Sequence, residues 1–413
     1  MKLAYLLSEY PTLPHTYLLR EIRRLRSLGW DIQTISVRRP QPHSTPLSEA
    51  ELLEFQATWY VLGDGLSRHA TAHATILLTH PAGYLRGLAT ALRLGSFHPR
   101  KTALALAYFA EAISVGHYLK KVGIEYVHSV YSSTVALILA RAFYIHLSMT
   151  LHGSGEFVDP EGFAIRDKVE AAERVCAISY FGRSQIMLWS DPADWSKLRV
   201  TPLGVDVNRW ATAECRGEPH PFELISVGRL VSGKGLSLLL DAVKDLVDMG
   251  KDVRLTLVGD GPDRPALEAQ AASLGVSQHV VFAGWMDQGA LHKLYRRSDV
   301  AVMSSFAEGV PVVLMEAMAT GIPCVAPRIT GIPELIRDGV DGLLFTASNV
   351  AEMATAITRL MDEPDLRRRM AVSARARITD KYNLEKNVDA LADIFSEWTG
   401  QSLRNRQRDR LDS

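Results

Sequence analysis

The sequence predicts an α/β protein of two Rossmann-like domains, each a doubly wound parallel sheet, that face each other across a cleft. Its 413 residues are enough for two separate hydrophobic cores. Strand-like and helix-like segments alternate almost throughout, which favours parallel sheets joined by crossover helices. The alternation stops at residues 211–221, where Gly217, Pro219 and Pro221 are typical of a linker, and then restarts.

The first predicted domain covers residues 1–210. Short apolar runs predict its strands, and longer stretches with helical periodicity predict its helices. The segment Arg39–Gly95 has no clear periodicity and is interpreted as an irregular, mainly helical insertion. The expected strands are Lys2–Leu7, Ile32–Val37, Tyr126–Ser129, His146–Thr150, Arg174–Ile178 and Leu198–Val200, and the expected helices include Thr16–Leu28, Lys101–Lys121 and Ser133–Phe143.

The second predicted domain, residues 211–380, has the pattern of a complete doubly wound unit. The chain after Met370 is expected to be helical to Trp398. Residues 381–413 are predicted to form a C-terminal helix that packs back toward the first domain, and a basic, disordered tail. The expected strands are Glu223–Val227, Arg254–Val258, Val280–Phe282, Val300–Met303 and Cys324–Ala326, and the expected helices are Ser237–Met249, Arg264–Leu274, Gly289–Arg296 and Pro311–Ala319.

The composition bounds the class of protein. A formal net charge of zero argues against a nucleic-acid partner. Three scattered cysteines, Cys176, Cys215 and Cys324, give no disulfide framework and no metal-ligand spacing, as expected in a reducing compartment. The apolar start of the chain ends too early for a signal peptide, and the longest apolar stretches are too short for a membrane span. We therefore expect a cytoplasmic protein, either soluble or peripheral to the inner face of the plasma membrane.

A turn in the second domain carries two cations. Gly228–Gly235 follows a strand and precedes a helix, and Arg229 and Lys234 could hold both phosphates of a nucleotide diphosphate. A Walker-type phosphate loop is excluded, because Gly235 stands where a Ser or Thr hydroxyl should bind magnesium. Taken alone, such cations are more often simply solvated.

The stretch Ser304–Met318 is the most informative in the chain. A helix is predicted to open at Pro311, and its free N–H groups and positive dipole end suit an anionic group. Glu308 and Glu316 flank this end, which makes sense if the ligand also carries hydroxyls, as a nucleotide sugar does. The alternative is a helix cap for Glu308 and a surface charge for Glu316.

Two further turns of the second domain could contact the donor. Gly259 and Gly261 follow a strand, where they allow close backbone approach to a ligand or form an ordinary tight turn. Trp285 and Met286 follow the next strand and could offer backbone groups to a base, although a packed Trp is at least as common there.

The first domain offers candidates on two loops. His152 ends a strand before flexible glycines and is expected to point into the cleft, although a lone His is more often structural. The loop Tyr10–Tyr17 follows the first strand, and Pro14, His15 and Thr16 are the predicted acceptor-binding residues. Basic residues suit either solubility or attraction to anionic lipid headgroups. They are Arg20, Arg23, Arg24, Arg26, Arg86, Arg93, Arg100 and Lys101.

These motifs together resemble a known family. The chain is similar to retaining glycosyltransferases of the GT-B fold, in the family 4 group, and especially to those that build colanic acid, amylovoran and related bacterial exopolysaccharides. The resemblance covers nearly the whole chain. It rests on Ser8–Pro11 with Leu19–Ile22, on Leu151–Gly153, on Gly228–Leu230 with Lys234–Gly235, on Gly259–Pro262, and on the spacing from Glu308 to Glu316 with Gly309 and Pro311–Val313.

The resemblance implies a role for each candidate. Arg229 and Lys234 would bind the donor diphosphate, Glu316 the ribose and Glu308 the transferred sugar, with Gly309, Val310 and Pro311 completing the donor site. His152 would lie near the reacting centre, so the predicted catalytic residues are His152, Arg229, Lys234 and Glu308. The chain departs from the family at Thr12–His15, where a glycine pair is usual, and after His152, where only a displaced Glu156 replaces the usual acidic partner.

The implied reaction moves a hexose from a nucleotide-diphosphate sugar, UDP on family grounds, to a hydroxyl of an undecaprenyl-diphosphate-linked glycan. No metal or other cofactor is expected, because two cations take the role of a metal at the diphosphate. With no carboxylate placed as a nucleophile, same-face displacement is favoured over a covalent intermediate. The alternatives are a sugar-nucleotide epimerase, a phosphorylase, or a non-catalytic nucleotide-binding scaffold of a polysaccharide assembly.

Overall fold

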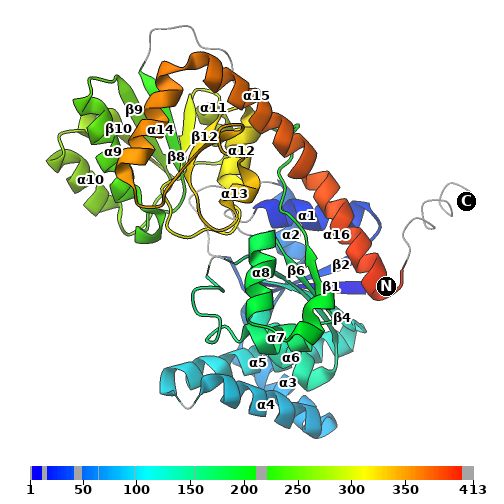
Figure 1. Ribbon diagram of the computed structural model, residues 1–413. Helices are drawn as coiled ribbons and strands as arrows, with labels where there is room; N and C mark the ends of the chain where they lie inside the picture. Colours follow the sequence, from blue (N-terminus) through cyan, green and yellow to red (C-terminus); the bar gives the residue numbers. More distant parts are fainter. Residues whose placement is uncertain are drawn as a thin grey trace, which may run out of the picture. The chain divides into compact units, whose positions relative to one another are not determined.

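The computed structural model describes residues 2–11, 16–40, 49–63, 65–96, 98–153, 155–210 and 221–401. The chain divides into two compact units. Unit 1 comprises Met1–Thr201 and Val388–Ser413, and unit 2 comprises Pro202–Asn387. Each unit contains one parallel sheet with helices on its faces, so the predicted class of two doubly wound α/β domains is confirmed (Figure 1).

The sheet of unit 1 has seven strands among the described residues, in the order β3-β2-β1-β4-β5-β6-β7. The order reverses between β1 and β4, which makes the loops after these two strands the topological switch point, where open α/β sheets bind ligands. The strands are β1 (Lys2–Glu9), β2 (Asp31–Arg38), β3 (Trp59–Tyr60), β4 (Tyr126–Val130), β5 (His146–Leu151), β6 (Arg174–Ala177) and β7 (Leu198–Val200). The helices are α1 (Thr16–Ser27), α2 (Glu49–Ala57), α3 (Leu66–Thr79), α4 (Pro81–Gly95), α5 (Pro99–Val122), α6 (Ser133–Phe143), α7 (Ile165–Ala171) and α8 (Tyr180–Leu188).

The described part of the insertion is mainly helical, as predicted, but it is regular rather than irregular, because α2, α3 and α4 fill most of it. In α4 the buried positions are small: Gly83, Gly87, Ala91 and Gly95. A Cβ on Gly83 would lie 2.3 Å from the carbonyl oxygen of Ala142 in α6. The buried face of α4 therefore consists of small residues, mostly glycine. The usual helical pattern of large apolar residues is absent, which is why the sequence did not predict a regular helix here.

The last helix, α16 (Leu384–Thr399), carries aromatic side chains onto the core of unit 1. Phe395 packs edge-on against His128 of β4 at 4.9 Å between ring centroids, and Tyr5 of β1 lies 4.9 Å from the same His. Arg24 of α1 makes two hydrogen bonds to Asp389 of α16, at 2.9 and 3.0 Å. These contacts attach the C-terminal helix to the N-terminal strands.

The sheet of unit 2 has six strands among the described residues, in the order β10-β9-β8-β11-β12-β13, with its switch point between β8 and β11. The strands are β8 (Phe222–Val227), β9 (Val253–Val258), β10 (Val280–Gly284), β11 (Val300–Val302), β12 (Cys324–Pro327) and β13 (Gly342–Phe345). The helices are α9 (Leu236–Asp248), α10 (Arg264–Ser273), α11 (Gln288–Tyr295), α12 (Val312–Thr320), α13 (Ile332–Leu335), α14 (Val350–Asp362) and α15 (Pro364–Lys381).

Continuous helix from Met370 to Trp398 is wrong, because α15 ends at Lys381 and α16 begins at Leu384. The break at Tyr382–Asn383 is stabilised on both sides. Asn383 pairs with Val205, and its side-chain oxygen accepts from the N–H groups of Glu385 and Lys386. The tail from Leu403 onward lies outside the described residues.

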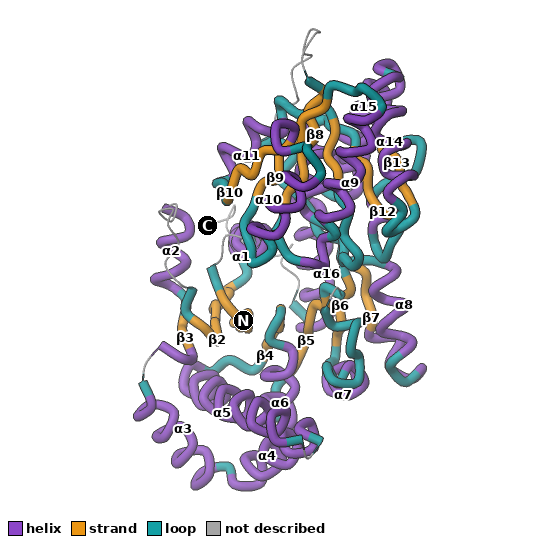
Figure 2. Tube along the Cα trace, turned by 90° about the vertical axis from the view of Figure 1, so that its left-hand side faces the viewer, coloured by secondary structure: helices purple, strands orange, loops and turns teal. Residues whose placement is uncertain are grey.

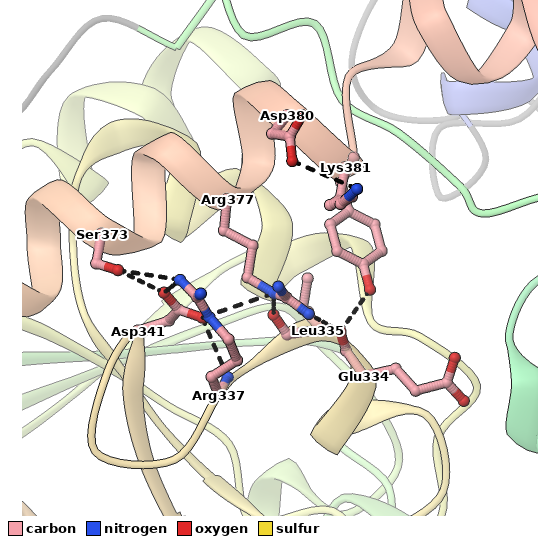
Figure 3. Close-up of polar contacts among 9 residues, drawn as sticks. Glu334, Leu335, Arg337, Asp341, Ser373, Arg377, Asp380 and Lys381 are labelled. Atoms are coloured by element: carbon pink, nitrogen blue, oxygen red, sulfur yellow. Dashed lines mark hydrogen bonds and ion pairs between the residues drawn. The ribbon is translucent and has the colours of Figure 1, made fainter.

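A buried carboxylate attaches α15 to the rest of unit 2 (Figure 3). Asp341 is fully buried and accepts from Arg337 Nε and from Ser373 Oγ, both at 2.7 Å, and Arg377 lies 3.6 Å away. Burial raises the pKa of Asp341, but the hydrogen bonds from Arg337 and Ser373 outweigh burial and bring it below its usual value. The α15 helix is thus fixed to the loop before β13 by a polar contact inside the unit.

Within the described ranges, no helix combines the length and the apolar character needed to cross a bilayer.

Candidate active site

The loops after β8 and β11 meet at the switch point of unit 2, and they carry Arg229, Lys234 and Glu308. The two loops are joined through their backbones. Phe306 N–H donates to the carbonyl of Gly233 at 2.9 Å, and Ser304 Oγ donates to the carbonyl of Lys234 at 2.9 Å. A pocket lies against this junction, lined by Ser226–Leu230, Lys234, Leu236 and Met303–Ser305.

Lys234 and Glu308 form an ion pair across this junction. Lys234 Nζ lies 2.6 Å from Glu308 Oε1. Lys234 ends a 3₁₀ turn, Ser232–Lys234, and Gly235 follows in the left-handed conformation with φ +60°. A Cβ on Gly235 would lie 2.2 Å from the carbonyl oxygen of Ser304, so this position requires glycine and sets the direction in which Lys234 leaves the turn. Arg229 is exposed on the same loop.

The glycines after β9 pack closely against the backbone of the Arg229 loop. Gly259 has φ +131°, and a Cβ there would lie 2.0 Å from the carbonyl oxygen of Gly228. A Cβ on Gly261 would lie 2.2 Å from the carbonyl oxygen of Leu230, whose N–H donates to Asp260 at 3.0 Å. The close approach that these glycines allow is therefore to the backbone on either side of Arg229.

The helix after β11 begins one residue later than predicted. The α12 helix starts at Val312, and Pro311 is its N-cap residue, whose carbonyl accepts from Leu314 and Met315 at 3.2 and 3.3 Å. Proline has no N–H group, and neither the N-cap position nor the first helical position needs one for a bond within the helix. The sequence alone therefore could not decide which of these two positions Pro311 takes. The first N–H groups of the helix still lack partners within the helix itself. Gly309 and Val310 lie on its approach, with Val310 buried against Gly331.

The alternative readings of the two glutamates are wrong. No side chain caps α12, and Glu308 pairs with Lys234 instead. Glu316 is buried at 6% exposure and is therefore not a surface charge. Its neighbour is Tyr295, whose hydroxyl donates to Val313 O at 3.0 Å and whose pKa is raised by burial and then by the charge of Glu316. Burying a carboxylate costs free energy, so a buried Glu316 is more easily explained by a binding role than by a structural one.

The turn between β10 and α11 lies next to the glycine loop, since Gly259 N–H donates to Gly284 O at 2.8 Å. Trp285 is exposed, so the packed-Trp alternative is wrong, and Met286 is half-buried. Unit 2 thus brings together, around the ends of β8 to β11, most of the residues predicted to bind the donor.

In unit 1, His152 follows β5 and its ring is enclosed by two tyrosines. Tyr131 stacks on it at 4.4 Å and Tyr17 lies 5.8 Å away, with the two hydroxyls 2.5 Å apart. Tyr17 Oη is 3.5 Å from His152 Nδ1. Tyr131, just after β4, has φ +64°, a strained conformation for a non-glycine residue. The sequence reasoning did not single out Tyr131, although its place at the switch point of this sheet is a signal that could have identified it.

Glu156 fixes the backbone that carries His152. Its Oε2 accepts from the N–H groups of His152 at 2.9 Å and Gly153 at 2.8 Å. Burial raises the pKa of Glu156, and these hydrogen bonds and the nearby Lys168 oppose that shift. Burial lowers the pKa of Lys168 to about 8, with Glu156 acting in the opposite direction. The sequence reasoning noticed Glu156 only as a displaced acid and did not find Lys168.

Comparison with known proteins identifies the kind of domain that carries this site. Residues 215–377 match the family model described as glycosyl transferases group 1. Unit 2 is a glycosyl transferase group 1 domain. The chain is 33% identical over 226 residues to alpha-D-kanosaminyltransferase of Streptomyces kanamyceticus, a match that covers 55% of each protein. The chain therefore spans about half the length of the first curated relatives it matches.

Two other relatives carry names close to the predicted function. The amylovoran biosynthesis glycosyltransferase AmsK of Erwinia amylovora is 24% identical over 412 residues, covering 96% of this chain and 99% of AmsK. The UDP-Gal:alpha-D-GlcNAc-diphosphoundecaprenol alpha-1,3-galactosyltransferase of Escherichia coli is 27% identical over 220 residues, covering 50% of this chain and 55% of that protein.

Solved structures identify the fold. HepE of Anabaena in complex with UDP superposes with a TM-score of 0.70 at 18% identity, covering 96% of this chain and all of HepE. The fold of the chain is GT-B.

The remaining predicted residues are not part of the geometry described above. Pro14 and His15 lie outside the described residues, and Thr16 is the first residue of α1. Two of the arginines of α1 serve ion pairs inside unit 1, Arg24 with Asp389 and Arg26 with Glu54, so the lipid interpretation loses support on this helix. Among the described residues, no group of three or more His, Cys, Asp or Glu side chains is arranged to hold a metal ion.

Proposed function

We propose that the chain is a retaining glycosyltransferase that moves a hexose from a UDP-sugar to a hydroxyl of a lipid-linked oligosaccharide in exopolysaccharide biosynthesis. One observation carries the proposal. At the switch point of a glycosyl transferase group 1 domain, Lys234 and Glu308 form an ion pair at 2.6 Å beside Arg229 and the start of α12. Two cations that suit a diphosphate and a carboxylate that suits sugar hydroxyls therefore lie in one small region, which supports the proposal.

The chemistry follows from charge. Breaking the bond between sugar and phosphate makes a cationic sugar and an anionic leaving group. Arg229, Lys234 and the first N–H groups of α12 would stabilise the developing negative charge, an arrangement that costs no reorganisation during the reaction. These groups would make a metal ion unnecessary at the diphosphate.

The carboxylates would position the donor. Glu308, which is paired with Lys234, would accept hydrogen bonds from hydroxyls of the transferred sugar. Glu316 would accept hydrogen bonds from the ribose hydroxyls. Trp285 and Met286 are assigned to the base, and His152 to outer hydroxyls of the sugar. Same-face displacement, with the leaving phosphate accepting the proton of the acceptor hydroxyl, would retain the anomeric configuration without a protein nucleophile.

The relatives support the finer parts of the proposal. AmsK is named for amylovoran biosynthesis, the Escherichia coli relative for a UDP-galactose donor and a diphosphoundecaprenol acceptor, and HepE was solved with UDP. Undecaprenyl-diphosphate-linked glycan is accordingly the acceptor class to test first.

A thermal-shift screen over nucleotide diphosphates and nucleotide sugars tests the proposal, because the best stabiliser identifies base and sugar together. We expect UDP and one UDP-hexose to stabilise the protein and that UDP-hexose to be transferred to a lipid-diphosphate-linked glycan, with retained configuration by NMR. Isomerised donor without acceptor would instead indicate an epimerase. Binding without hydrolysis or transfer would indicate a scaffold, and no stabilisation by any nucleotide would end the proposal.

A further inference from the structure

The outer helices of unit 1 lack carboxylates. The whole chain has 46 acidic and 46 basic residues, yet from Gly65 to Ala110 it contains no Asp or Glu. The same stretch contains five basic residues, Arg68, Arg86, Arg93, Arg100 and Lys101. It forms α3, α4 and the first half of α5. A surface with such a bias attracts anionic partners.

This stretch also exposes leucines. The α3 and α4 helices form an outer layer over α5, and α4 also covers α6 (Figure 2). Four exposed positions of α4 recur at helical spacing and are apolar: Ala82, Leu85, Ala89 and Leu92. The exposed Arg93 lies next to Leu92 and pairs with Asp167 of α7. Leu78 at the end of α3 is 82% exposed, and Leu85 is 59% exposed. The solvent face of a surface helix is normally polar, so this face has the character of an interaction surface.

Basic and aromatic groups accompany the leucines. Arg100 and Lys101 are exposed in the first turn of α5, and Leu104 is exposed in the second turn. The guanidinium of Arg86 lies 4.3 Å from the ring centroid of Tyr144, an exposed residue that follows α6. An amphipathic ring beside a cation is typical of a membrane–water interface.

Two acidic residues of the nearby α7 helix are each paired with an arginine, one on α4 and one on α6. Asp167 pairs with Arg93, and Glu170 pairs with Arg141 at 3.1 Å. They do not compensate Arg100 and Lys101 on α5. The combination of a wide apolar face, a basic margin and no carboxylate from Gly65 to Ala110 fits an anionic lipid surface better than a protein partner, whose docking face would offer its own mixture of charges.

We propose that α3, α4 and the first turns of α5 dock on a bilayer that carries anionic lipid headgroups. Leu78 and Leu85 enter the headgroup layer, and Arg100 and Lys101 contact lipid phosphates. The proposal uses no residue of the candidate active site. Its failure would leave the proposed transfer reaction unaffected, and its success would not establish that reaction.

Vesicle co-sedimentation at low ionic strength tests the docking surface. We expect the full chain to bind vesicles of equimolar phosphatidylglycerol and phosphatidylcholine and not vesicles of phosphatidylcholine alone. The double variant Arg100→Gln/Lys101→Gln should lower the partition coefficient about 25-fold, since each basic residue near such a surface contributes about fivefold. Leu78→Gln/Leu85→Gln should abolish the binding that remains at high salt.

Matched controls use exposed residues elsewhere. Leu188→Gln, at the end of α8, removes a leucine of similar exposure (69%), and Arg368→Gln/Lys381→Gln removes two exposed cations of α15. Both controls should bind as the wild type does. Equal binding to both kinds of vesicle, no binding at all, or unchanged binding by the two test variants would overturn the proposal. So would ultracentrifugation showing that Leu78→Gln/Leu85→Gln only dissolves a dimer, because a second copy would then cover this face.

Discussion

The ammonium group of Lys234 lies where two loops of unit 2 are joined, and it forms an ion pair with the carboxylate of Glu308. Both side chains are partly exposed, at 28% and 11%, so the pair itself adds little to stability, on the order of 1 kcal/mol or less. Its position is fixed more firmly than its energy suggests, because Gly235 and the hydrogen bond from Ser304 determine how the lysine leaves its turn. We interpret Lys234 as a cation that is positioned in advance to bind an anion.

Replacing Lys234 by alanine should therefore cut turnover and leave the fold intact. Loss of one preorganised charge at a developing anion costs about 100-fold or more in kcat. Steady-state kinetics with the UDP-sugar found by the thermal-shift screen would measure this. The control is Lys244→Ala in α9, which removes an exposed lysine paired with Asp248 and should leave kcat unchanged. Wild-type turnover by the Lys234 variant would contradict the assigned role.

His128 is a buried base whose cost appears at low pH. It is fully buried in β4, where it contacts Ser148 Oγ at 2.7 Å and Thr150 Oγ1 at 3.1 Å, and burial lowers its pKa from 6.5 to about 3. The unfolded chain therefore binds a proton that the folded chain does not as pH falls below 6.5. The stability associated with neutral His128 is complete above that pH and is lost as pH decreases toward the folded pKa.

The expected loss from this single group is about 1.5 kcal/mol between pH 6.5 and about pH 5. Urea unfolding of unit 1 across this range would measure it. His128→Gln should unfold more easily at neutral pH but show a shallower dependence of the unfolding free energy on pH. His146→Gln, at an exposed position beside Glu173, should keep the wild-type slope. Equal slopes for the wild type and His128→Gln would exclude this explanation.

At the scale of elements, hydrophobic alternation was enough to place most strands and many of the helices, although α14, Val350–Asp362, was not predicted. Ser133–Phe143 was predicted with both of its ends, because it is a mainly apolar segment that is interrupted only near its end, by Arg141. The sequence reasoning missed β13, Gly342–Phe345, since four residues after a turn carry too little pattern. It also missed the order within the insertion, because the packing stripe of α4 is Gly83, Gly87 and Ala91 rather than large apolar residues.

Some residues of the candidate site could be predicted from the sequence and others could not. The residues at the ends of β8 and β11 could be predicted, because parallel strands bring consecutive turns to one edge of a sheet. The place of Tyr131 at the switch point could be inferred from the sequence, but its stacking on His152 could not, since the stacking depends on a backbone conformation, φ +64°, that no local pattern encodes. The support that Glu156 gives to the His152 backbone likewise depends on how the loop folds back.

The α15 helix depends on one buried carboxylate. Replacing Asp341 by alanine leaves Arg337 and Ser373 without their acceptor and should destabilise unit 2 by about 3 kcal/mol. Urea unfolding of the variant would measure the change in free energy. Asp380→Ala removes an exposed carboxylate 3.5 Å from Lys381 on the same helix and should cost less than about 0.5 kcal/mol. A similar small cost for both variants would show that the contact in Figure 3 does not hold the helix.

At the scale of the whole molecule, the two units share a topology and differ in what they hold. In both, the strand order reverses beside the first strand of the sheet. In unit 2 the loops at that point carry cations and carboxylates, and in unit 1 they carry Tyr10 after β1 and Tyr131 after β4. The residues assigned to the nucleotide diphosphate all belong to unit 2. Nucleotide binding should therefore act on one unit's stability.

Differential scanning calorimetry with UDP tests this division. At a UDP concentration about 100-fold above its dissociation constant, the nucleotide should stabilise the folded state by about 2.7 kcal/mol. The shift should appear in the transition of unit 2, which Asp341→Ala identifies because it lowers that transition selectively. Lys234→Ala should remove most of the shift, whereas Lys244→Ala should keep it. A UDP-induced shift confined to the other transition, or one of full size in the Lys234 variant, would move the diphosphate site away from the junction of the β8 and β11 loops.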